Sequence, residues 1–85
     1  MTYSRNPDIA FRIIDGEAVL VDPKAGTTFV LNAVGSCVWA VLENATLESL
    51  IARVCHEFSA NEADARNDIE SFLSNLIEKR LAFSV

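Results

Sequence analysis

Residues 9–22 read IAFRIIDGEAVLVD, two runs rich in apolar and β-branched residues on either side of Asp15-Gly16. An Asp-Gly pair between such runs is a strong hairpin signal, because a type I′ turn needs positive φ at both central positions. The sequence therefore predicts strands over residues 9–14 and 17–22, paired antiparallel.

A second turn follows at residues 23–26, PKAG, where the proline presets φ and the glycine tolerates the left-handed region. The next run, TTFVL at residues 27–31, is again typical of a strand. Two tight hairpins give an antiparallel meander in which the first and third strands are the edges.

After residue 32 the apolar period changes from two to 3.6, which indicates helices. Each predicted helix is preceded by a side chain that caps helix N-termini well. The predicted helices are 33–43 after Asn32, 47–58 after Thr46 and 62–78 after Asn61.

The predicted fold class is α+β, a three-stranded antiparallel meander followed by three helices, which resembles a winged-helix arrangement with the wing placed first. Eighty-five residues supply one small core. We interpret residues 1–8 as a flexible lead-in and residues 9–85 as a single domain. Residues 81–85 alternate in polarity and form either a short terminal strand or a tail.

Charge argues against nucleic acid and membrane as partners. Seven basic and 12 acidic residues give a net charge of −5, whereas phosphate contacts need surplus Lys and Arg. In a winged-helix protein the third helix reads DNA, and here that helix has several acidic residues and a single basic residue, Arg66. DNA binding therefore stays only as an alternative. Because residues 1–8 lack an apolar signal-peptide core, we expect a cytoplasmic protein.

The residue types that carry catalysis or bind metals are sparse. Cys37 and Cys55 lack metal-type spacing, which favours two free thiols, with a disulfide between helices as the alternative. His56 is the only histidine, and it cannot form a nucleophile pair with Cys55 because adjacent helical residues do not face each other. The sequence therefore predicts that the protein is not an enzyme and that it binds no metal and no cofactor.

A binding surface is the remaining possibility. The strand at residues 27–31 is an edge, and an unpaired edge presents N–H and C=O groups to an extended peptide. If the third helix packs beside this edge, the two form a groove. The alternatives are that residues 1–8 or 81–85 cover the edge, or that a second copy pairs with it in a homodimeric adaptor.

At this point the sequence resembles the PqqD-like family of stand-alone elements that recognise the precursors of ribosomally made peptide natural products. The ordered set that carries the resemblance is D-G-x-A-V-L-x-D at 15–22, F-x-L-N-x-x-G at 29–35, V-W at 38–39, A-x-x-D-I-x-x-F-L at 65–73 and L-I-E-x-x-L at 76–81. A glycine common in the family is replaced by Arg80, which leaves the end of the third helix less defined.

The resemblance implies a non-catalytic module that binds a leader peptide as an added strand. It implies as partners the precursor peptide and a modifying enzyme such as a radical-SAM enzyme, a protease or a cyclase. The implied peptide-binding residues on the strand are Thr27, Thr28, Phe29, Val30 and Leu31, and those on the third helix are Ala65, Asp68, Ile69, Phe72, Leu73 and Leu76. Several of these also fit a core role. A proline at Phe29 is expected to weaken peptide binding by removing a donor from the edge.

Overall fold

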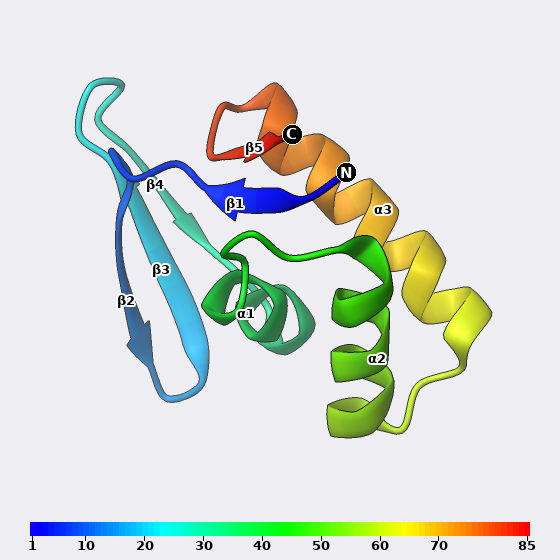
Figure 1. Ribbon diagram of the computed structural model, residues 1–85. Coiled ribbons are helices and arrows are strands. Elements are labelled where there is room, and N and C mark those ends of the chain that lie inside the picture. Colours follow the sequence, from blue (N-terminus) through cyan, green and yellow to red (C-terminus); the bar gives the residue numbers. More distant parts are fainter.

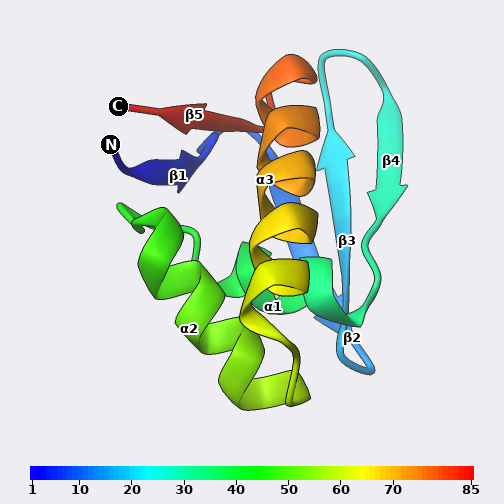
Figure 2. The same ribbon diagram turned by 90° about the vertical axis from the view of Figure 1, so that its right-hand side faces the viewer.

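The protein is described by a computed structural model of residues 1–85. Its sheets and helices form two layers, with the helices on one side of the main sheet (Figures 1 and 2). In chain order the elements are β1 Tyr3–Arg5, β2 Ala10–Ile14, β3 Glu17–Asp22, β4 Thr27–Val30, α1 Ala33–Ala40, α2 Leu47–Phe58, α3 Glu62–Glu78 and β5 Ala82–Ser84. The predicted α+β class, with a three-stranded meander followed by three helices, is confirmed.

The main sheet has the strand order β2-β3-β4, and both pairs are antiparallel. Asp15 and Gly16 both have positive φ, 52° and 81°, as the first predicted turn requires. In the second turn the Asp22 carboxylate accepts the backbone N–H groups of Lys24 and Ala25, and Gly26 has a φ of 70°. Local turn chemistry therefore sets the register of the whole meander.

The N-terminal segment differs from the prediction of a flexible lead-in. Residues Tyr3–Arg5 form β1, which pairs antiparallel with β5 in a second, two-stranded sheet. The Asn6 side chain adds a hydrogen bond to the Arg80 carbonyl oxygen at 2.8 Å. The pairing partners stand at opposite ends of the sequence, which is why no local pattern reveals them. Of the two readings of residues 81–85, the strand is correct.

The helices begin at the predicted caps, but the first ends early. Side chains of Asn32, Thr46 and Asn61 each accept a backbone N–H at the start of their helices. The first helix stops at Ala40 rather than at residue 43, and Asn44 then takes a positive φ of 52°. None of the helices is long and apolar enough to cross a membrane.

At the end of α3, Arg80 adopts a φ of 59°, a left-handed conformation that suits glycine better. Arg80 therefore takes this conformation without being a glycine, and α3 ends at Glu78.

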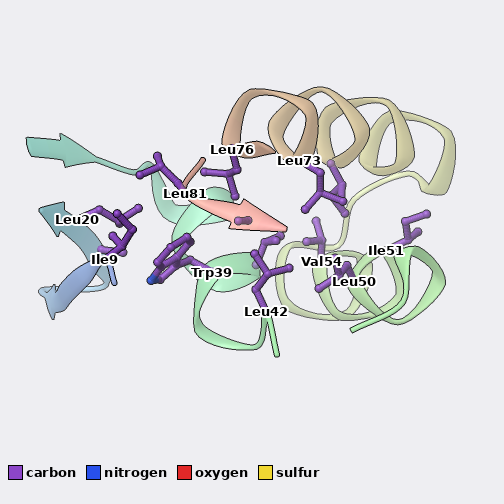
Figure 3. Close-up of a cluster of buried hydrophobic side chains, with 14 of the residues drawn as sticks. Ile9, Leu20, Trp39, Leu42, Leu50, Ile51, Val54, Leu73, Leu76 and Leu81 are labelled. Atoms are coloured by element: carbon purple, nitrogen blue, oxygen red, sulfur yellow. The ribbon is translucent and has the colours of Figure 1, made fainter. Parts of the chain in front are cut away.

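The core lies between the sheet and the helices and is centred on Trp39, which is fully buried (Figure 3). From the sheet, β3 contributes Ala18 and Leu20, both at 0% exposure. Helix α1 contacts β3 on one side and α2 and α3 on the other, so it joins the two layers. Both cysteines are free and half-buried.

Ser36 is the one buried polar side chain, and it links α1 to the sheet. Its hydroxyl accepts the Ala18 N–H at 2.7 Å and donates to the Leu31 carbonyl at 3.2 Å. These two backbone groups would otherwise be buried without partners, because the β3–β4 ladder opens at this point.

Replacement of Ser36 by alanine is expected to lower the free energy of unfolding by about 2 kcal/mol, because buried N–H and C=O groups lose their partner. Urea denaturation followed by circular dichroism measures this change. Ser74→Ala, at an exposed position of α3, is the control and should stay within about 0.5 kcal/mol of wild type. Equal stability of the two variants would show that Ala18 and Leu31 pair without the hydroxyl.

Candidate functional site

The outer edge of β4 carries backbone groups that no other strand occupies. The Leu31 N–H donates to the Ala18 carbonyl of β3 at 2.9 Å. In an antiparallel pair the residues that face the partner alternate, so Thr27 and Phe29 also point their backbone groups at β3. The N–H and C=O groups of Thr28 and Val30 therefore point away from the sheet, as a two-residue docking edge.

The side chains of β4 divide between the two faces of the sheet. Phe29 and Leu31 are half-buried and pack against the core. Val30, on the opposite face, is 64% exposed. Thr27 and Thr28 are exposed as well. The five strand residues predicted to bind a peptide thus form one edge, with Phe29 and Leu31 partly committed to the core.

Next to the end of β4 lies a hollow of about 410 Å³ between α1 and α3, which we call the α1–α3 hollow. Figure 2 shows α3 running alongside the sheet, with α1 below it near the end of β4. The hollow is lined by Asn32, Val34, Gly35, Val38, Asp68, Ile69, Ser71, Phe72 and Asn75. Because Asn32 follows Leu31 directly, the docking edge leads into the hollow.

The floor of the hollow depends on a close approach between α1 and α3. A Cβ atom on Gly35 would lie 3.2 Å from Cε1 of Phe72 and 3.2 Å from Oδ1 of Asn32. Asn32 must keep its place, since it caps α1 by accepting the Gly35 N–H at 2.8 Å. The missing side chain at Gly35 is therefore what lets the Phe72 ring rest against α1.

The structure separates the six predicted α3 residues into two groups. Asp68, which is exposed, and Phe72, which is half-buried, line the hollow. Ala65, Ile69, Leu73 and Leu76 are core residues with exposures of 2%, 1%, 2% and 3%, too little to contact a peptide directly, although Ile69 also forms part of the lining. The groove between β4 and α3 stays a prediction, and the hollow that the structure describes lies between α1 and α3.

The charge around the hollow is acidic. Asp68 is the one ionisable side chain in the lining. Arg66, the only basic residue of α3, lies elsewhere, at 2.8 Å from Glu48 and 3.5 Å from Glu62. The hydrogen bond to Glu48 and the charge of that carboxylate raise the pKa of Arg66. No cation therefore offsets Asp68 inside the hollow.

Several lining residues were missed by the sequence reasoning, namely Asn32, Val34, Gly35, Val38, Ser71 and Asn75. In the sequence, Asn32 is identified only as a helix cap and as part of the family resemblance, and Gly35 only as part of that resemblance. A glycine inside a helix, where it costs stability, was the available signal for a close contact. No group of three or more His, Cys, Asp or Glu side chains is placed to hold a metal ion.

Comparisons with known proteins find one family and two solved structures that this chain is similar to. The sequence profile of the family described as Coenzyme PQQ synthesis protein D (PqqD) matches residues 17–82. The solved structure "TbiB1 in Complex with the TbiA(beta) Leader Peptide" is 31% identical, with a TM-score of 0.87 and 96% of each chain covered. "Lasso peptide synthetase B1 complexed with the leader peptide" is 22% identical, with a TM-score of 0.82 over 99% of this chain and 100% of that chain. Among curated proteins no sequence matches.

The fold and the site together define a small winged-helix-like α+β domain with an open sheet edge beside a helix-lined hollow. This chain belongs to the PqqD family, as the sequence resemblance predicted.

Gly35→Ala tests the close approach that shapes the hollow. The added Cβ should push the Phe72 ring outward, while the gain in helix propensity offsets the crowding and keeps the free energy of unfolding within about 1 kcal/mol of wild type. The ring resonances of Phe72, measured by NMR, should shift. Ser71→Ala changes the lining without adding an atom and should leave them in place. Unmoved ring resonances in Gly35→Ala would contradict this account of the floor.

Proposed function

We propose that this protein binds the leader segment of a ribosomally made precursor peptide as an additional strand on β4. The observation that carries the proposal is the unpaired edge at Thr28 and Val30, which leads into the α1–α3 hollow. Membership of the PqqD family and the likeness to two proteins solved with leader peptides support it.

Strand addition explains how such an edge achieves both affinity and selectivity. Backbone hydrogen bonds to Thr28 and Val30 hold any extended chain, and side chains of the bound strand alternate between the two faces of the sheet. Those on the helix side of the sheet point toward the region of Phe72 and Asp68. The bound segment should therefore place an apolar side chain near Phe72 and no carboxylate near Asp68.

The role is delivery rather than catalysis. The lining of the hollow has no His, Cys or Lys that acts as a nucleophile or as a base near neutral pH. The chemistry then belongs to a partner, a modifying enzyme such as a radical-SAM enzyme, a protease or a cyclase, which the family resemblance implies. The protein presents the precursor to that enzyme.

Two other functions compete for the same features. A homodimer that uses the β4 edge would occupy the docking groups, and light scattering after size exclusion detects it directly. DNA binding through α3 is disfavoured further by the pairing of Arg66 with Glu48, because that contact removes the helix's only free cation.

The test is a proline at an edge position that faces outward. Val30→Pro removes a docking N–H but no bond to β3, so the domain should fold while affinity for the leader peptide falls about tenfold. Phe29→Pro, the substitution suggested by the sequence alone, removes an N–H that faces β3 and should damage the fold instead. Titration of isotope-labelled protein with the synthetic leader of a precursor encoded beside its gene measures affinity and site together.

The matched control is Ile13→Pro, which removes an outward N–H from the opposite edge of the same sheet. Its leader affinity should equal that of wild type. Equal affinity of folded Val30→Pro and wild type would overturn the proposal, as would a stable dimer that ignores the peptide.

A further inference from the structure

The main sheet has a second open edge, on β2. The two-residue turn at Asp15-Gly16 makes Ile14 and Glu17 a hydrogen-bonded pair, so Arg12 and Ala10 also point their backbone groups at β3. The N–H and C=O groups of Phe11 and Ile13 therefore face away from the sheet. All five residues of β2 are exposed.

Apart from Arg12 this edge is apolar, which is unusual for an unpaired strand, because natural sheets protect their edges with charges, prolines or bulges. Phe11, Ile13 and Ile14 are exposed by 41%, 45% and 52%. Figure 1 shows β2 on the far side of the sheet from β4, with no helix alongside it. Large apolar side chains beside free backbone groups favour a second strand as the occupant.

Phe11 is held in place before anything docks. Its ring meets Trp39 edge to face, with the ring centroids 5.7 Å apart, and the Arg5 guanidinium lies 5.0 Å from its centroid. Arg5 is fixed in turn by hydrogen bonds to the Trp39 and Ala40 carbonyl oxygens. A large aromatic side chain that is half-exposed yet immobilised is the typical anchor of an interface, since little conformational entropy is lost on binding.

A second copy of the chain fits this edge poorly. The backbone N–H and C=O groups that face outward are those of Phe11 and Ile13. Two copies can therefore pair along the whole of β2 only when Phe11 of one copy lies opposite Ile13 of the other. That register puts Arg12 directly opposite its own equivalent, and like charges in such a pair are destabilising. Each copy also carries a net charge of −5.

Arg12 instead specifies a partner of opposite charge. Its side chain is exposed and takes no part in the ion pairs of the structure, which involve Arg5, Lys24, Arg53 and Arg66. We propose that the β2 edge docks an extended strand of a second protein, with a carboxylate opposite Arg12 and apolar side chains beside Phe11 and Ile13.

The identity of that second protein as the modifying enzyme rests on the proposed function, but the edge itself does not. With the leader on β4 and the enzyme on β2, the two partners occupy opposite edges of one sheet and do not compete. The leader and the enzyme are then bound to this domain at the same time, on either side of the three strands.

The test uses two synthetic probe peptides with blocked ends, Thr-Val-Glu-Val-Thr and Thr-Val-Lys-Val-Thr, added at millimolar concentration to isotope-labelled protein. The glutamate peptide should shift the amide resonances of residues 10–14 and bind about fivefold more tightly than the lysine peptide. Arg12→Glu should reverse that preference. Absence of shifts at residues 10–14, equal binding of the two peptides, or an unchanged preference in Arg12→Glu would overturn the proposal.

Two proline variants separate this edge from the leader site. Ile13→Pro should abolish the shifts at residues 10–14, whereas Val30→Pro should leave them intact. Leader binding is measured by the shifts at residues 27–31, where Val30→Pro is the test variant and Ile13→Pro the control. A negative result for one edge is therefore distinguishable from a negative result for the other. A wild-type dimer that Ile13→Pro dissociates would identify a second copy as the occupant and overturn the proposal.

Discussion

The central constraint is that β3 alone has its backbone paired on both sides. Its even-numbered residues bond toward β4 and its odd-numbered residues toward β2, so each neighbour is left with one free row of N–H and C=O groups. Ala18 and Leu20 turn their side chains into the core from the same strand. Because β3 anchors both the hydrogen bonding and the packing of the sheet, the open edges are held rigid without being covered.

The helices give the two edges different surroundings. Helix α1 is joined to the sheet by the Ser36 hydroxyl, and Phe72 of α3 rests over Gly35 of α1, one turn after the buried Ile69. One helical turn thus supplies both a core side chain and a side chain of the hollow, which is what the spacing of three residues permits. The β4 edge therefore adjoins a shaped, acidic hollow, whereas the β2 edge adjoins Arg5 and the ring of Phe11.

Local chemistry predicted most of the fold but not the parts that depend on distant partners. Asp15-Gly16, the three helix caps and the 3.6-residue period each act within a few residues, and the meander and helices formed where expected. The β1–β5 pairing joins Tyr3 to Ser84, and no signal within a three-residue strand predicts such a partner.

For the candidate site, the sequence identified the β4 edge and the side of α3 that faces inward. It did not distinguish Phe72, which is half-buried and lines the hollow, from Leu73, which is buried at 2% exposure, because both are apolar residues at helical spacing. Nor did it show which strand residues face outward. The direction in which each strand residue faces depends on the register. Because the N–H of Val30 faces outward and that of Phe29 faces β3, a proline blocks docking at Val30 and not at Phe29.

Two open edges on so small a domain are a liability, since unpaired strands join indiscriminately. The molecule limits this in ways that leave specific docking intact. The strands are short, four residues in β4 and five in β2, so an added strand gains few backbone bonds and needs side-chain contacts as well. A net charge of −5 keeps copies apart, and Arg12 opposes the one full-length self-pairing of β2. At β4 the neighbouring hollow stabilises a bound strand only when the side chains of that strand fit the hollow. The same features that suppress aggregation therefore make each edge selective for a different partner.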